Sequence, residues 1–185
     1  MNRNIPFHFS FFTYKMLKLL CPSMYVTSVT DIDTALLKER GYGYIMIDLD
    51  NTLLPWGEIK FSPEVVGWVE KTISRGFKMC IVSNASGKRV KFLSEKLGVP
   101  FIYYAGKPCK GGFLRGLNLM NGNIERSVVI GDQIFTDILG GNRAGIMTVL
   151  VRPVKKKELF TTRIMREFEK MAIYLLKRRG FFPEL

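Results

Sequence analysis

The chain has 185 residues and a formal net charge of +12, with 47% hydrophobic and 24% charged residues. This length suffices for one domain with a buried core, and the composition excludes a disordered or fibrous chain. Three cysteines without a CxxC pair and a single histidine argue against a disulfide framework and against a zinc site, as is typical of a reducing compartment.

The positive charge is concentrated at the two ends of the chain. Residues 1–30 carry three cations and no acid, and residues 152–185 carry ten cations and four acids. They contribute +3 and +6 to the net charge of +12, which leaves +3 for the residues between them. We therefore expect a basic N-terminal arm over 1–30, a domain over 31–153 and a basic C-terminal segment over 154–185. Such ends suit an anionic surface, either a membrane or a nucleic acid.

Residues 5–20 of the arm form an aromatic and aliphatic run that a histidine, a serine and two lysines interrupt. The run is too short and too polar to span a bilayer, and it lacks the charged start and small-residue cleavage site of a secretory signal. Three interpretations stay open: an interfacial membrane anchor, an arm that packs on the domain, or an extension upstream of a natural start at Met16.

Apolar runs and helical patterns alternate through the domain. Five apolar runs predict strands, at about residues 43–48, 77–82, 101–104, 127–130 and 147–151. Helical patterns precede the first strand and separate the others, around residues 38–40, 63–75, 86–97, 110–120 and 137–144. Five strands that alternate with helices predict an α/β fold with a doubly wound parallel sheet.

Residues 161–179 predict the clearest amphipathic helix of the chain. Ile164, Phe168, Met171 and Leu175 recur at spacings of four, three and four, and lysines and arginines populate much of the remainder. Two interpretations stay open. Either the helix docks on the sheet with its basic face in solvent, or it lies on anionic lipid headgroups.

The first predicted strand ends on two acids. Asp48 and Asp50 follow its apolar run, and Asn51 and Thr52 come next. A buried carboxylate is costly unless something compensates for its charge, so acids at the end of a core strand need a function or a partner. In open α/β sheets, ligands bind at the carboxyl end of the strands.

Three further predicted strands also end in chemically useful residues. Ser83 and Asn84 follow the second strand, Lys107 follows the third, and Asp132 follows the fourth, with Asp137 five residues later. Because parallel strands share one carboxyl edge, we expect these residues to converge on the two acids of the first strand. Carboxylates around one point suit Mg²⁺, while a hydroxyl, loop N–H groups and an ammonium suit phosphoryl oxygens. The pattern predicts phosphoryl transfer.

Four motifs in this order resemble those of the haloacid dehalogenase (HAD) superfamily. Its DxDxT motif resembles Asp48-Leu49-Asp50-Asn51-Thr52, and the later motifs resemble Val82-Ser83-Asn84, Lys107-Pro108 and the stretch 131–137. The resemblance covers about residues 44–151 and is narrowest to the subfamily IIIA, YqeG-like phosphatases, which include mitochondrial-type phosphatidylglycerophosphate phosphatase. It implies a HAD-like Rossmannoid three-layer sandwich, with the five predicted strands in the order 5-4-1-2-3. It also favours Met16 as the natural start.

The resemblance implies a role for each motif residue. Asp48 would attack phosphorus to form an aspartyl-phosphate, while Asp50 would protonate the leaving oxygen and then activate the hydrolytic water. Mg²⁺ would be held by the Asp48 carboxylate, the Asp50 backbone carbonyl and Asp132. Thr52, Ser83 and Asn84 would bind the substrate. Lys107 would compensate for the negative charge, and Asp137 would position the metal or Lys107.

The intervals between the motifs leave no room for a cap domain. Asp50 and Ser83 are 33 residues apart, Ser83 and Lys107 are 24 apart, and predicted helices and strands fill both intervals. An open site admits the phosphorylated end of a large or membrane-embedded substrate. With the basic, apolar ends, this predicts Mg²⁺-dependent dephosphorylation of phosphatidylglycerophosphate to phosphatidylglycerol. We expect a cytoplasmic protein that contacts the inner face of the membrane peripherally.

Two other functions stay open. One is a soluble HAD phosphatase that acts on a sugar phosphate, a nucleotide or a phosphoprotein. The other is a non-enzymatic nucleic-acid- or ribosome-binding module on a HAD scaffold, against which the intact acid pair and the absence of a nucleic-acid-binding motif argue. The sequence leaves the oligomeric state undetermined.

Overall fold

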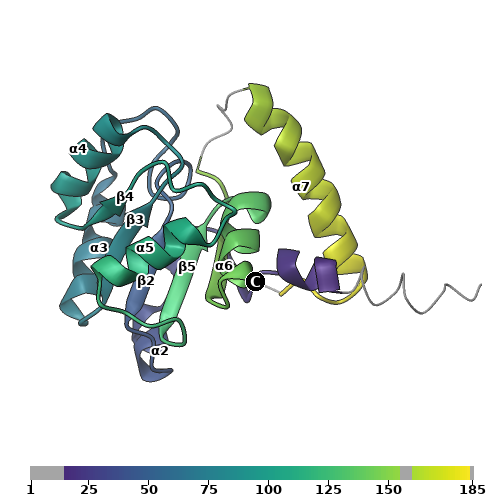
Figure 1. Ribbon diagram of the computed structural model, residues 1–185, viewed down its shortest axis with the longest axis horizontal. Helices are drawn as coiled ribbons and strands as arrows, with labels where there is room; N and C mark the ends of the chain where they lie inside the picture. The colour runs from purple at the N-terminus through teal and green to yellow at the C-terminus, as the bar shows by residue number, and fades with distance from the viewer. Residues whose placement is uncertain (1–14, 155–159, 184–185) are drawn as a thin grey trace, which may run out of the picture.

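A single six-stranded parallel sheet forms the centre of the computed structural model, which describes residues 15–154 and 160–183, with the backbone alone over 160–166 (Figure 1). The strand order is β1-β6-β5-β2-β3-β4. The strands are β1 (Met24–Val26), β2 (Tyr44–Ile47), β3 (Lys78–Val82), β4 (Phe101–Ile102), β5 (Ser127–Gly131) and β6 (Met147–Val151).

Helices connect successive strands, and their ends follow ordinary capping chemistry. The elements are η1 (Val29–Asp31), α2 (Thr34–Glu39), α3 (Pro63–Ser74), α4 (Gly87–Leu97), α5 (Gly111–Leu119), the π-helical turn η2 (Ile134–Ile138), α6 (Leu139–Arg143) and α7 (Phe160–Arg178). Residues 15–20 are also helical. Asp33 caps α2 by accepting hydrogen bonds from two backbone N–H groups, and Ser62 caps α3 by accepting one from the N–H of Val65.

The sheet is buried between two layers of helices. On one face, Ile45 of β2 belongs to a core that includes Trp68 of α3 and Leu93 of α4. On the other face, the neighbouring Met46 packs in a second core with Phe113 of α5. Successive strand residues therefore face opposite layers, and both faces are apolar. The predicted three-layer α/β sandwich is confirmed.

The predicted strand order is confirmed, but the predicted number of five strands is wrong. The five predicted strands are neighbours in the order β6-β5-β2-β3-β4, and β1 adds a sixth beside β6, with Met24 paired to Val149. Three half-buried residues give too short a run for a hydrophobic period to be visible. The predicted strand 101–104 also ends early, because Tyr103 and Tyr104 turn outward, the latter with φ 43°.

The interval between Asp50 and Lys107 contains only a loop, α3, β3, α4 and β4, so no cap domain is inserted there. The prediction of an uncapped domain is therefore confirmed.

Helix α7 lies beyond the β1–β6 side of the sheet (Figure 1) and docks on the domain through Ala172 and Leu176, which are buried. The predicted stripe is rotated away: Phe168, Met171 and Leu175 are exposed. The cause is a buried glutamate on the docked face, Glu169 of α7, which accepts a hydrogen bond from the backbone N–H of Ile134. The side chain of Ile164 lies outside the described residues.

The N-terminal arm is described only from residue 15. Its helical residues 15–20 contribute Leu17 and Leu20, both partly buried, to the cluster around Leu176 of α7. Most of the apolar run 5–20, and with it the choice between an anchor and an extension, lies outside the described residues. Within the described chain, no helix is both long and apolar enough to cross a bilayer.

Candidate active site

The loops that follow β2, β3, β4 and β5 enclose a cavity of about 170 Å³ at the carboxyl edge of the sheet. The parallel arrangement puts the ends of these strands side by side, so residues far apart in sequence meet there. The cavity is lined by Asp48, Asp50, Asn51, Trp56, Ser83, Asn84, Ala85, Lys107, Gln133 and Thr136. Five of the predicted site residues therefore share one cavity.

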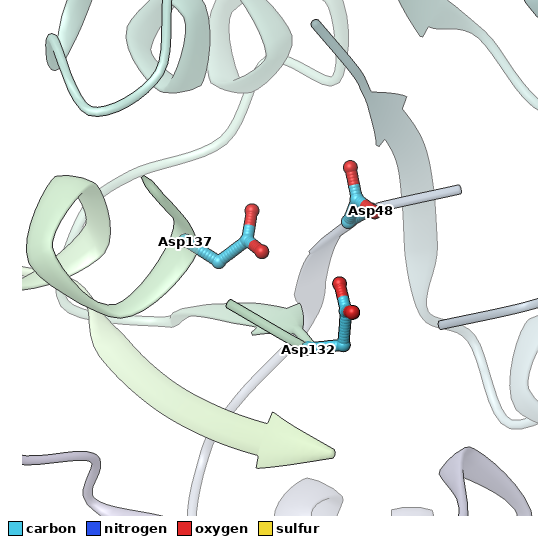
Figure 2. Close-up of side chains that lie close together, drawn as sticks. All are labelled: Asp48, Asp132 and Asp137. Atoms are coloured by element: carbon cyan, nitrogen blue, oxygen red, sulfur yellow. The ribbon is translucent and has the colours of Figure 1, made fainter. Parts of the chain in front are cut away.

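Three carboxylates converge beside this cavity (Figure 2). Asp48 follows β2, Asp132 follows β5 and Asp137 lies in η2, and their side chains offer oxygens that all lie within 4.8 Å of one another. The three residues are no more than 8% exposed. Such a group of buried acids is stable only if cations or protons compensate for its charge.

Lys107 supplies one compensating charge. Its ammonium donates hydrogen bonds to Asp48 and, at 2.7 Å, to Asp137, and the residue is 7% exposed. The Asn84 side chain fixes the backbone of this lysine, because its Oδ1 accepts from the Lys107 N–H at 2.9 Å and its Nδ2 donates to the Lys107 carbonyl at 3.1 Å. The second and third motifs are thereby joined.

The pKa values of the pair reflect this burial. Desolvation raises the pKa of the Asp48 carboxyl to about 7, an effect that Lys107 opposes and the charge of Asp137 reinforces. Desolvation alone would lower the pKa of Lys107, but the two adjacent carboxylates outweigh it and hold that pKa above its ordinary value. Lys107 therefore stays protonated at neutral pH and contacts two of the three carboxylates.

The excess of carboxylate over ammonium fits a hard divalent cation. Oxygen ligands at short mutual distances are what Mg²⁺ prefers, and a cation would replace the proton that burial otherwise holds on Asp48. Two of the predicted ligands, Asp48 and Asp132, belong to this cluster. Asp137, for which a positioning role was predicted, contributes the third carboxylate and also binds Lys107.

Asp137 fits into the cluster because Gly131 has no side chain. A Cβ atom built on Gly131 would lie 2.2 Å from Cγ of Asp137, so only glycine leaves room for this carboxylate. The backbone N–H of Gln133 then donates to Asp137 Oδ2 at 3.2 Å. Within the fourth motif, residues 131–137, Gly131 thus makes room for the carboxylate of Asp137, and the backbone N–H of Gln133 holds it in place.

Thr52 and Trp56 lie near the acids but differ in exposure. Thr52 is 1% exposed, and its hydroxyl donates to Asp132 Oδ1 at 3.5 Å. Trp56 lines the cavity and is 46% exposed. The hydroxyl of Thr52 therefore faces a predicted metal ligand, while its direct contact with substrate stays a prediction.

The sequence interpretation missed Arg89 of α4. Its Nη1 donates to both carboxylate oxygens of Asp50, at 2.7 and 2.9 Å. The available signal was its place in the first turn of the helix that follows Ser83 and Asn84, since that turn begins at the carboxyl edge of the sheet. A surface lysine or arginine is common at such positions, so the pattern alone does not single it out.

Metal binding should raise the stability of the protein, and more so at pH 8 than at pH 6. A ligand at about 100 times its Kd adds ~2.7 kcal/mol to the free energy of unfolding. Because the pKa of Asp48 is about 7 without metal, the carboxylate is available above that pH and protonated below it, so the Mg²⁺ increment is lost as the pH falls. Urea unfolding with and without MgCl₂ at both pH values measures the difference.

Asp132→Asn supplies the control for this prediction. The variant removes a carboxylate of the cluster, and its unfolding free energy should respond weakly to Mg²⁺ at either pH. An equal Mg²⁺ increment in the variant and the native protein would rule out this cluster as the metal site.

Comparison with known proteins agrees with the geometry. Residues 104–159 match the family model described as HAD-hydrolase-like. The chain is 44% identical over 163 residues to the "Probable phosphatase YqeG" of Bacillus subtilis (strain 168), which covers 88% of this chain and 95% of that protein. It is 26% identical to the "Phosphatidylglycerophosphate phosphatase 1, chloroplastic/mitochondrial" of Arabidopsis thaliana, over 87% of this chain and 48% of that protein.

A solved structure shares the fold. A protein from Listeria monocytogenes serotype 4b superposes with a TM-score of 0.52 and 22% identity, over 63% of this chain and 84% of that one. At this identity the similarity supports the fold, and the function rests on the first relative and on the site. An α/β domain with this strand order, four motifs at one edge and 44% identity to YqeG along nearly the whole chain belongs to the HAD family and is a phosphatase of that family.

Proposed function

We propose that the protein dephosphorylates phosphatidylglycerophosphate to phosphatidylglycerol at a membrane surface, with Mg²⁺ and an aspartyl-phosphate intermediate on Asp48. The observation that carries the proposal is the buried cluster of three carboxylates and Lys107 at an uncapped cavity. It supplies a nucleophile, compensating charge and open access in one place.

The chain's own residues account for both steps of hydrolysis. With Asp50 starting in its protonated form, an Asp48 oxygen attacks phosphorus as the bond from phosphorus to the leaving oxygen breaks, and Asp50 gives that oxygen its proton and becomes a carboxylate. Asp50 then takes a proton from water, which attacks the same phosphorus and breaks its bond to Asp48. Phosphate leaves and both aspartates return to their starting states.

Charge compensation makes Asp48 available as a nucleophile. Burial favours its protonated form, whereas Lys107 favours the carboxylate. Mg²⁺ held by Asp48, Asp132 and the Asp50 carbonyl would neutralise charge between the nucleophile and the phosphoryl group. Ser83 and the backbone N–H of Asn84, at the end of β3, would bind the phosphoryl oxygens.

The outward face of α7 supports a lipid substrate. Phe168, Met171 and Tyr174 are each more than half exposed, and Leu175 is 39% exposed. Lys170, Lys177 and Arg178 lie on the same helix. Exposed apolar residues with neighbouring cations suit the interface of an anionic membrane, so we propose that α7 makes a peripheral contact there.

We expect the double variant Phe168→Glu/Met171→Glu to bind anionic vesicles at least ~10-fold more weakly. The variant removes two apolar side chains from the outward face of α7 and adds electrostatic repulsion from the anionic lipid. Hydrolysis of phosphatidylglycerophosphate in vesicles should fall with it, while hydrolysis of a soluble short-chain analogue stays unchanged. Vesicle sedimentation and phosphate release measure the two effects. Leu119→Glu, at an exposed apolar residue of α5, is the matched control.

The proposal also has a plain negative outcome. If the purified protein with Mg²⁺ leaves phosphatidylglycerophosphate intact but cleaves a sugar phosphate or nucleotide efficiently, the substrate is soluble. The phosphatase assignment would then stand without the lipid.

A further inference from the structure

Arg89 holds the carboxylate that the proposed reaction requires. Nη1 of its guanidinium contacts both oxygens of Asp50, and Nη2 and Nε donate to the backbone carbonyl of Glu58 at 2.7 and 3.2 Å. The pair is only partly buried, with 21% and 16% of the two side chains exposed. Arg89 is therefore clamped between the acid and the loop after β2, at the edge of the cavity.

This contact cannot persist unchanged when substrate binds. To give a proton to the leaving oxygen, one oxygen of Asp50 must face that oxygen at hydrogen-bond distance. A single nitrogen of the guanidinium, Nη1, contacts both oxygens. The oxygen that carries the proton is a poor acceptor, so its hydrogen bond from Nη1 weakens and that N–H can turn to another anion.

The role proposed for Asp50 indicates where that acceptor lies. If Asp50 serves the leaving oxygen, a group that contacts Asp50 from α4 lies on the side of the alcohol rather than of the transferred phosphate. The backbone carbonyl of Glu58 keeps the guanidinium in place from behind. An anion on the alcohol is the acceptor that matches a guanidinium best.

We propose that Arg89 selects the substrate: its guanidinium exchanges the Asp50 carboxylate for a second anionic group, which the alcohol of the phosphomonoester carries. The inference rests on the proposed function, in which Asp50 serves the leaving group. The phosphodiester of phosphatidylglycerophosphate, at the far end of the glycerol, is one such group, and the second phosphate of a soluble bisphosphate is another. Both present phosphate oxygens to the fork of the guanidinium.

Three soluble substrates test the proposal without any membrane contribution. They are a short-chain phosphatidylglycerophosphate below its micelle concentration, glycerol 1,3-bisphosphate and glycerol 3-phosphate, which lacks the second anion. In Arg89→Met, kcat/KM for the first two should fall about 10- to 100-fold further than for the third, the range that losing a charged hydrogen bond gives, while any fall common to all three reports the lost contact with Asp50. Arg89→Lys should recover part of the loss because it keeps the charge without the fork.

Lys91→Met is the matched control. It removes one positive charge from the same helix, from an exposed lysine whose ammonium lies 3.9 Å from Glu95. All three substrates should keep kcat/KM within ~2-fold in this variant, as is expected for an exposed pair. The effect of Arg89→Met then belongs to the guanidinium and not to the overall field of the helix.

The outcomes separate this proposal from the proposed function. An equal fall for all three substrates in Arg89→Met, or no fall for any, overturns the selection role. If the native protein cleaves glycerol bisphosphate in preference to glycerol 3-phosphate and Arg89→Met abolishes the preference, selection stands even when the lipid is not cleaved. If the native protein cleaves neither the short-chain lipid nor glycerol 1,3-bisphosphate in preference to glycerol 3-phosphate, the proposal for Arg89 fails, while the assignment as a phosphatase stands.

Discussion

Replacing Asp48 with asparagine should lower kcat/KM for phosphomonoesters by at least ~10⁴-fold, since removal of a nucleophile from other covalent hydrolases costs about this much or more. The amide oxygen can still accept the hydrogen bond of Lys107, so the geometry is kept while the attacking carboxylate is lost. The thermal midpoint should not fall, because the substitution removes a buried charge. Phosphate release by the purified variant measures the loss of activity, and thermal unfolding measures its midpoint.

Glu95→Gln is the control, since it makes the same carboxylate-to-amide change on the exposed face of α4. It should keep the activity of the native protein. Residual activity of Asp48→Asn within ~100-fold of the native value would assign the nucleophile to another residue.

Lys107→Met should destabilise the metal-free protein by about 3–5 kcal/mol at pH 8, the range found when one partner of a buried ion pair is removed. The variant leaves Asp48 and Asp137 buried beside each other without the ammonium that contacts both. The pKa of Asp48 already lies near 7 with the lysine present, and its removal raises it further. The penalty should therefore shrink toward pH 5, where the Asp48 carboxyl is protonated.

Urea unfolding in EDTA at pH 8 and pH 5 measures this effect. Lys91→Met, which removes an exposed lysine, should change the unfolding free energy by less than ~0.5 kcal/mol at either pH. A penalty for Lys107→Met that is equally small, or that grows as the pH falls, would contradict the view that this lysine compensates the two acids.

The fold was largely predictable because its strongest signals are local. The strands β2, β5 and β6 are apolar runs buried on both faces, which alternate with capped helices, and this pattern indicates a parallel α/β sheet. Two features depended on distant contacts instead. Strand β1 exists because it pairs with β6, and the docked face of α7 is set by Glu169, whose partner lies 35 residues earlier.

The site residues also divide into those that local sequence signals placed correctly and those whose contacts depend on distant parts of the chain. Asp48 and Lys107 could be placed together from their positions at strand ends, because all parallel strands end at one edge. The resemblance implied that Asp137 positions the metal or Lys107, but that its carboxylate joins those of Asp48 and Asp132 depends on the space above Gly131, which the sequence pattern does not show. Arg89 was hidden for a similar reason: only the folded loop brings Glu58 and Asp50 to opposite ends of its guanidinium.

The stereochemistry at phosphorus tests the covalent role of Asp48 most directly. The phosphoryl group of a phosphomonoester made chiral with three oxygen isotopes would be transferred to an acceptor alcohol in place of water, and the configuration of the product ester determined. Attack by Asp48 followed by a second displacement predicts overall retention, because two in-line inversions cancel. Overall inversion would show that water or the acceptor attacks the substrate directly, which contradicts an aspartyl-phosphate intermediate.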